Sequence, residues 1–303
     1  MRDRYEKAQA FLTNLSENSP ELPFEPSLLP DLFEATSDSS TKTIDHIAAL
    51  VERSQGLASR ILRQANSAYY GIQTEVSSLG HAVRLLGLNE VRNIIVQLGV
   101  ASAVKNLPLP KNFQFERLWE HQLFTANIAR SIAKTVPHIA GPGSAVSPDE
   151  LYAAGLLHDM GKTMLASLCP ADWEAIQDLA VCENIPFYQA EENYWGLDHA
   201  VVGARLLTFW GIPERLTELV NFHHSPQLAK PEFQAPARLL AAANLLAHNL
   251  DIAEPEDAEV FTVPESVTAV LPENVDQRQL QESFAASCDV ERVRGMAKTA
   301  MSI

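Results

Sequence analysis

A histidine followed directly by an aspartate, His158-Asp159, is the feature of this 303-residue sequence that points most directly to chemistry. Four more histidines stand where they could join that pair: His121, His199, His223 and His224. Imidazole and carboxylate groups together suit iron, manganese, nickel or zinc. Two such ions a few ångströms apart can clamp a phosphate and activate a water molecule for attack. These residues therefore predict a site for one or two divalent transition-metal ions.

Lys162 adds a positive charge close to the His-Asp pair. If a phosphate binds beside the metal, this lysine would lie next to it as a point charge. We therefore take Lys162 and Asp159 as the candidate catalytic residues, and Asp159 is a candidate metal ligand as well.

The His-Asp pair is expected at the end of a helix. Residues 147–150 have the pattern of a capping box, with Ser147 as the N-cap and a proline in the first helical position. The helix should run to about Asp159, and Gly161 is its predicted stop. On a frayed last turn the two side chains can converge on one ion, although regular helix geometry would point them apart.

The other histidines are expected on amphipathic helices. Apolar residues recur every three or four positions from about residue 115 to 134, which puts His121 on the buried stripe. Asp198 is the predicted N-cap of a helix that His199 opens. Gly203 in that helix would let a neighbouring helix approach closely.

Two further helices complete the predicted arrangement. One begins near Pro213 and ends at His223-His224, so that two imidazoles arrive at a helix end. The other covers residues 237–249 and puts Asn244 and His248 in one row with two alanines. Asn244 is then a polar side chain on a buried face, whereas His248 belongs to no predicted ligand set.

Each of these residues also has an ordinary structural explanation. A single histidine on an apolar helix face, such as His121, is more often a hydrogen-bonded core residue than a ligand. His223-His224 could be cations that the dipole of a helix C-terminus favours. His199 could be a surface residue of a first turn, and Asn244 a buried hydrogen-bonding amide. The combination favours a metal site, because five of the nine histidines fall at helix ends or on inner faces.

Together, the five histidines and Asp159 resemble the motifs of the HD superfamily of metal-dependent phosphohydrolases. The segment 158–162 with the later His199 and the His223-His224 pair is especially similar to the HD-GYP branch, which hydrolyses cyclic di-GMP. One departure is that no Gly-Tyr-Pro sequence follows His224.

The resemblance implies one further ligand. Residues 237–244 resemble the last helix of the family, whose metal-binding aspartate is replaced here by Asn244. A neutral asparagine can coordinate through its carbonyl oxygen, but it binds a cation less tightly than aspartate does. The second ion should therefore be weakly bound or absent, and a single metal would make hydrolysis slow.

The first third of the sequence resembles the HDOD family, an HD-related output domain of bacteria. The resemblance rests on Leu22-Pro23 with Pro26, on residues 58–71 and on residues 81–87, and it covers about residues 10–250. Proteins of this family are largely viewed as signalling or regulatory modules, and many have lost the HD ligands. The near-complete ligand set of this sequence keeps hydrolysis open.

Strand signals are sparse, so the sequence predicts an all-α fold, an HD-domain-like helical bundle with an additional N-terminal helical lobe. Two prolines in residues 107–111 mark the expected boundary. We expect an N-terminal lobe of HDOD type at 1–110 and an HD-like metal-site lobe at 111–250. Residues 251–303 should form an acidic segment and a C-terminal helix that packs on the HD-like lobe.

Composition excludes some function classes. A formal net charge of −15 argues against nucleic acid as a partner, because phosphate neutralisation needs a concentrated basic face. Three cysteines without metal-type spacing fit free thiols in a reducing cytoplasm. No signal peptide and no run of roughly 20 apolar residues is found, so we expect a cytoplasmic protein without a membrane span.

Three functions remain open. The first, which we favour, is a bacterial signalling or regulatory protein whose site binds metal or a phosphorylated ligand and thereby changes its contacts with protein partners. The second is a metal-dependent phosphohydrolase acting on a nucleotide or a cyclic dinucleotide. The third is a metal-free interaction scaffold with hydrogen-bonded core histidines. We find no receiver or sensor segment before the first lobe, so the signal is expected to arrive by binding.

Overall fold

The computed structural model describes residues 2–17, 28–35, 43–66, 76–105, 107–136 and 146–252. Every regular element within these ranges is a helix, which confirms the predicted all-α class. Contacts along the chain divide it into two compact units. Unit 1 comprises residues 1–20, 106–209 and 214–303, and unit 2 comprises residues 21–105 and 210–213.

Unit 2 is a stack of short helices: α2 (Leu28–Ala35), α3 (Ile44–Glu52), α4 (Gln55–Ala65), α5 (Leu79–Leu86) and α6 (Leu88–Lys105). Thr43 and Ser78 cap α3 and α5, since each hydroxyl accepts a hydrogen bond from a backbone N–H in the first turn. Gly87, with φ of 80°, makes the sharp turn between α5 and α6. Asn66 exchanges two hydrogen bonds with the Val76 backbone, and the Tyr69-Tyr70 part of the HDOD resemblance lies outside the described residues.

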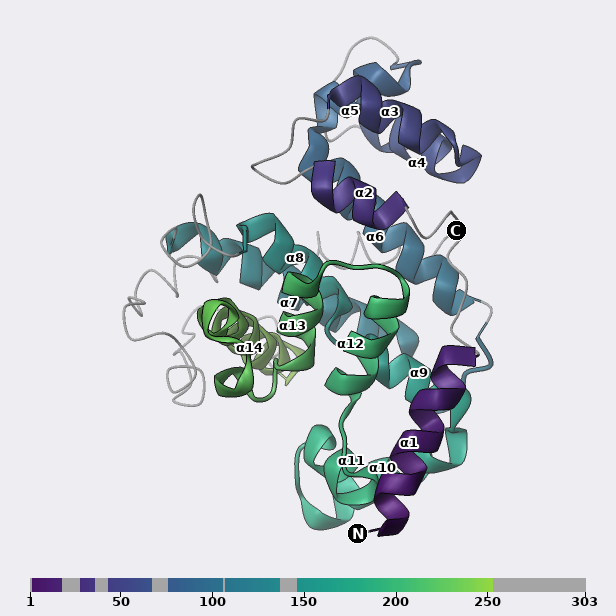
Figure 1. Cartoon of the computed structure of the whole chain (residues 1–303), viewed down its shortest axis with the longest axis vertical. Helices are drawn as coiled ribbons and strands as arrows, with labels where there is room; N and C mark the ends of the chain where they lie inside the picture. Colours follow the sequence, from purple (N-terminus) through teal and green to yellow (C-terminus); the bar gives the residue numbers. More distant parts are fainter. Residues whose placement is uncertain are drawn as a thin grey trace. The chain divides into compact units, whose positions relative to one another are not determined.

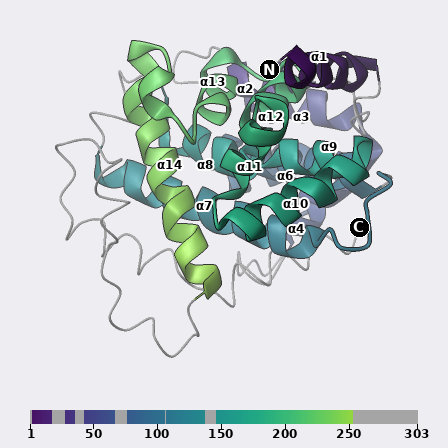
Figure 2. The same ribbon diagram turned by 90° about the horizontal axis from the view of Figure 1, so that it is seen from below.

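Unit 1 holds the remaining helices: α1 (Arg2–Glu17), α7 (Phe115–Thr135), α8 (Pro148–Leu157), α9 (Met160–Leu168), α10 (Pro170–Glu183), α11 (Phe187–Trp195), α12 (His199–Phe209), α13 (Glu214–Asn221), η2 (Pro226–Leu228) and α14 (Pro231–Ile252). Within this unit α12 contacts both α9 and α13 (Figure 1). The long helix α14 crosses α7 and also contacts α8 (Figure 2). The helices thus surround the turn between α8 and α9.

The start of α8 is as the sequence predicted. The Ser147 hydroxyl accepts from the Glu150 N–H at 3.2 Å, and the Glu150 carboxylate accepts from the Ser147 N–H at 2.9 Å. The predicted end was wrong, because α8 stops at Leu157 and α9 begins at Met160. His158 and Asp159 form the turn between two helices, and Gly161 lies inside α9.

Gly161 serves close packing instead of helix termination. A Cβ atom at this position would lie 1.9 Å from the carbonyl oxygen of His199, the first residue of α12. Gly203, on α12, faces the same contact, since a Cβ there would lie 3.2 Å from the Gly161 nitrogen. The prediction that Gly203 permits a close helix approach is therefore confirmed.

Two of the other predicted helices have the expected ends, and two have different ends. The helix expected at 115–134 is α7, and α12 begins at His199 with the Asp198 carboxylate as its cap. The helix near Pro213 ends at Asn221, so the His-His pair follows it instead of closing it. The last helix, α14, begins at Pro231 and accommodates Pro236 in its second turn. No helix in the described ranges is long and apolar enough to cross a membrane.

Helix α1 belongs to unit 1. It contacts α11 and α12, and the Phe11 and Trp195 rings lie 4.6 Å apart between centroids. It therefore groups with unit 1 and not with residues 21–105, which follow it. The segment 253–303, expected to pack on the HD-like lobe, lies outside the described residues.

Replacing Gly161 with alanine should lower the free energy of unfolding by about 1–3 kcal/mol, because the new methyl group overpacks the contact between α9 and α12. Urea denaturation measures this change. The control is Gly56→Ala in α4, where a Cβ meets nothing within 4 Å. That variant should be unchanged or more stable by up to about 1 kcal/mol. Equal stability of Gly161→Ala and the parent would contradict the close helix contact.

Candidate metal centre

The structure brings every predicted site residue together inside unit 1. His121 comes from α7, His158 and Asp159 from the turn between α8 and α9, His199 from the start of α12, His223 and His224 from the segment after α13, and Asn244 from α14. All of these side chains are buried except that of His224, which is half-buried. His121 and Asn244, the first and the last of these residues in the sequence, come together because their helices pack against each other.

Asp159 lies at the middle of the cluster. Its Oδ1 atom is 2.9 Å from the His199 Nε2 atom and 3.9 Å from the His223 Nε2 atom. Its Oδ2 atom is 3.4 Å from the His158 Nε2 atom and 3.7 Å from the His121 Nε2 atom. The two oxygens of one carboxylate therefore face different pairs of imidazoles.

These contacts divide the site into two half-sites. The first half-site consists of His199, His223 and His224, and the second consists of His121, His158 and Asp159. Within each group the potential ligand atoms all lie within 4.8 Å of one another. Because Asp159 also reaches His199 through Oδ1, its carboxylate is placed to bridge the two half-sites.

Hydrogen bonds to backbone carbonyl groups fix which ring nitrogen of His158 and of His223 carries the proton. The Nδ1–H of His158 donates to the Gly155 carbonyl at 2.8 Å, and that of His223 donates to the Val220 carbonyl at 2.7 Å. Both Nε2 atoms are buried and have no hydrogen-bond partner in the described part of the chain. An outward hydrogen bond with a free inward nitrogen is the usual preparation of a metal-binding imidazole. These residues thus fit a divalent metal ion.

The protonation states also suit a cation. Burial by itself raises the pKa of Asp159, but the charges of His158 and Lys162 outweigh it and hold that pKa well below the usual range. Burial lowers the pKa of His158, and burial with the neighbouring histidines lowers the pKa of His223 well below its ordinary value. His158 and His223 therefore present neutral imidazoles beside the Asp159 carboxylate, and these are the forms that bind metals.

Lys162 lies beside the carboxylate. Its Nζ atom donates to Asp159 Oδ2 at 2.7 Å, and its side chain keeps 15% of its surface exposed. Lys162 is thus a partly exposed charged residue in direct contact with the buried carboxylate.

The second half-site contains a neutral contact. The His121 Nε2 atom lies 2.9 Å from Asn244 Oδ1, so the ring nitrogen that faces Asp159 is already hydrogen-bonded. His248, one turn further along α14, stacks its ring on that of His121 with 4.2 Å between centroids. His248 is in neither group of potential ligands, as the sequence predicted, and the contact that it makes with the cluster is this ring stacking.

Two neighbours of the cluster carried no sequence signal that singled them out. The buried Glu191 carboxylate on α11 accepts from the His199 backbone N–H at 3.0 Å and from its Nδ1–H at 2.5 Å. Tyr188, on the same helix, stacks on His224 with 4.2 Å between ring centroids and 12° between planes. Burial disfavours the His199 imidazolium, but Glu191 and Asp159 outweigh it and raise the pKa of His199 to about 9.

The family model of the HDOD domain matches residues 22–226, more than half of the chain. The chain belongs to the HDOD family. The matched range includes every predicted ligand except Asn244, which lies beyond its end. The sequence resemblance to this family is therefore confirmed.

Solved structures share the fold of this HDOD protein. An HDOD domain protein with unknown function from Geobacter sulfurreducens is 24% identical, with a TM-score of 0.71 over 97% of this chain and 98% of that chain. A candidate phosphohydrolase from Shewanella amazonensis is 23% identical, with a TM-score of 0.69 over 95% and 98%. A candidate signal-transduction protein from Marinobacter aquaeolei is 21% identical, with a TM-score of 0.74 over 99% and 66%.

A curated relative is longer than this chain. An uncharacterised protein of Treponema pallidum is 24% identical over 279 residues, which are 90% of this chain and 52% of that protein. The chain thus spans about half the length of this relative. At these identities the comparisons with solved structures establish the fold, while activity has to be argued from the site.

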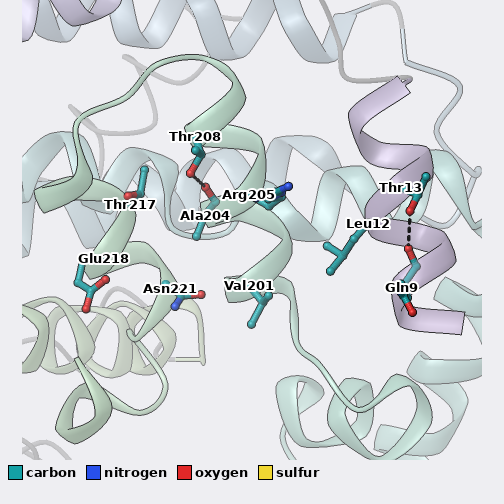
Figure 3. A pocket seen from close by; sticks show the side chains of 10 residues that line it. All are labelled: Gln9, Leu12, Thr13, Val201, Ala204, Arg205, Thr208, Thr217, Glu218 and Asn221. Atoms are coloured by element: carbon teal, nitrogen blue, oxygen red, sulfur yellow. Dashed lines mark hydrogen bonds between the residues drawn. The ribbon is translucent and has the colours of Figure 1, made fainter. Parts of the chain in front are cut away.

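A surface hollow of about 460 Å³ lies elsewhere on unit 1 of the HDOD protein. It is formed by α1, α12 and α13 and is lined on the α12 side by Val201, Arg205 and Thr208 (Figure 3). None of the predicted ligands lines this hollow. The His-Asp cluster is accordingly a packed core site and not part of this groove.

His158→Ala should abolish the stabilisation that metal gives to this HDOD protein. An ion present at 100 times its Kd stabilises the native state by about 2.7 kcal/mol, so a chelator should lower the melting temperature of the parent. The variant should melt at one temperature with or without chelator. His46→Ala, on an exposed position of α3, serves as the control and should respond like the parent. If the chelator leaves the melting temperature of the parent unchanged, that result would contradict a bound metal.

Proposed function

We propose that this HDOD protein is a signal-transduction or regulatory protein whose metal centre binds a phosphorylated ligand and thereby changes its contacts with protein partners. The observation that carries the proposal is the pair of buried Nε2 atoms, on His158 and His223, that lack a hydrogen-bond partner among the described residues. Buried polar atoms are normally satisfied, so two such atoms facing one carboxylate, one in each half-site, support the binding of cations there. The residues that would hold one or two ions are His121, His158, Asp159, His199, His223, His224 and Asn244.

The ligand we propose is a phosphorylated small molecule or a cyclic dinucleotide. A bound divalent transition metal supplies a Lewis acid for phosphate oxygens. Lys162 can bind the same phosphate, because its side chain is only partly buried and its Nζ atom lies beside the Asp159 carboxylate, 2.7 Å from Oδ2. His224 is the other half-buried member, and the stacked Tyr188 ring beside it offers an apolar face.

Asn244 favours a regulatory role over rapid hydrolysis. Its amide carries no charge, and it hydrogen-bonds the His121 nitrogen that faces Asp159. An ion in the second half-site would have to displace that hydrogen bond without gaining a charged ligand. We therefore expect the second half-site to bind its ion weakly, which suits ligand binding better than turnover.

A metal-dependent phosphohydrolase is the second candidate function. One observation favours it, namely that both oxygens of Asp159 face imidazoles, so that a single carboxylate could bridge two ions. In that case Asp159 and Lys162 remain the candidate catalytic residues. The names of the Shewanella amazonensis and Marinobacter aquaeolei structures, a candidate phosphohydrolase and a candidate signal-transduction protein, are compatible with both functions.

The deciding experiment is elemental analysis of protein purified without chelators or an affinity metal column. We expect near-stoichiometric iron, manganese, nickel or zinc that is missing from the His158→Ala variant. Calorimetric titration of the loaded protein with cyclic di-GMP and with mononucleotides then tests the ligand. Protein that holds no metal and takes up none from added ions would contradict the proposal and favour the interaction scaffold.

Asn244→Asp should strengthen the second half-site. A charged ligand replaces a neutral one, so we expect the second ion to bind about tenfold more tightly, equal to about 1.4 kcal/mol, and phosphodiesterase turnover to rise with it. Metal titration and hydrolysis of a chromogenic phosphodiester measure the two effects. Asn112→Asp, on an exposed residue outside the cluster, is the matched control. If neither quantity rises, Asn244 is not what limits the site.

A further inference from the structure

We propose that Glu191 is a positioning residue of the metal centre and that it makes the first half-site the one that takes up an ion first. The inference rests on the proposed function only in requiring that the histidines bind metal. It states which half-site fills first. It also attributes this order to Glu191, a residue outside the predicted ligand set.

Glu191 fixes the His199 ring from behind. Its Oε2 atom accepts from the backbone N–H of His199 at 3.0 Å and from the ring Nδ1–H at 2.5 Å. On the far side of the ring, Nε2 lies 2.9 Å from Asp159 Oδ1. The imidazole is therefore held by a carboxylate at one nitrogen while the other nitrogen faces the centre.

Capping of α12 alone does not explain this carboxylate. Helix α12 already has a cap, because the Asp198 side chain accepts from the Val201 N–H at 3.2 Å. Glu191 is 1% exposed, and its second oxygen, Oε1, has no hydrogen-bond partner among the described residues. A buried carboxylate is costly unless a positive partner uses its charge. A glutamine could accept the hydrogen bond from the His199 backbone N–H equally well. The negative charge of Glu191 therefore needs a separate explanation.

The second half-site has no such carboxylate. His121 has a neutral partner, Asn244, and that partner lies on Nε2, the nitrogen that faces Asp159. The inner nitrogen of His199 is hydrogen-bonded as well, since its Nε2 atom lies 3.0 Å from the His224 Nε2 atom. The two half-sites therefore differ in the charge behind the ring: the Glu191 carboxylate on the outer nitrogen of His199 fixes the imidazole and makes its inner nitrogen a stronger ligand. The two half-sites should consequently fill in order, with the first half-site filled first.

The test is Glu191→Gln, which keeps the size of the side chain and an oxygen for the His199 backbone bond but removes the charge. Titration with Co²⁺ against a competing chelator should show the first-ion affinity lowered roughly 10–100-fold, together with a change in the visible Co²⁺ absorption. Glu192→Gln, the exposed next residue on α11, removes the same charge and should leave both unchanged. Melting of each metal-free variant checks that it is folded.

A second pair of variants separates positioning from general stability. In a His199→Ala background, Glu191→Gln should cause no further loss of affinity, because its effect passes through the imidazole. Equal losses in both backgrounds, or an unchanged first-ion affinity in Glu191→Gln, would overturn the inference while leaving the metal centre intact. Absence of Co²⁺ binding by the parent would instead overturn the proposed function and the inference with it.

Discussion

The charge of Asp159 is the constraint on which the arrangement of unit 1 depends. The carboxylate is fully buried, and burying an ion costs several kcal/mol unless partners replace the lost water. Those partners, four imidazoles and the Lys162 ammonium, come from α7, the turn between α8 and α9, α9 itself, α12 and the segment after α13. Five parts of the chain must therefore meet at one point, so that the stability of the bundle and the assembly of the site have the same physical origin.

Glycine makes this meeting possible. Gly161 lets α9 lie directly on the backbone of α12, and Gly155 lets α8 lie on α7, where a Cβ would come within 2.5 Å of the Ala126 Cα. Neither glycine has an unusual backbone conformation, since positive φ occurs elsewhere in the described chain. Their role is to remove side-chain volume, and the resulting short distance between backbones lets histidines from separate helices share one carboxylate.

Unequal surroundings give the two half-sites unequal chemistry. The first half-site has a buried carboxylate behind His199, and the second has a neutral amide in front of His121. In our proposal this asymmetry is the reason why the centre binds a phosphorylated ligand as a sensor and does not hydrolyse it rapidly. This HDOD protein thus brings together nearly all of the predicted metal ligands but has a neutral side chain, Asn244, where a second charge would favour rapid hydrolysis.

Local signals in the sequence determined the helical class and the capping box at Ser147 and Glu150, because caps and periodic apolar positions act within one or two turns. The grouping of five histidines with Asp159 came instead from their combination and from the family resemblance. Gly161 shows the limit of such signals, since a glycine after a helix reads as a stop whether or not another backbone lies against it. Only the tertiary structure shows that Glu191 and His248 contact the cluster. Glu191 reaches His199 across the turn between α11 and α12, and His248 reaches His121 through the packing of α14 on α7. Neither contact lies within a single helix, so the periodicity of a helix could not predict it.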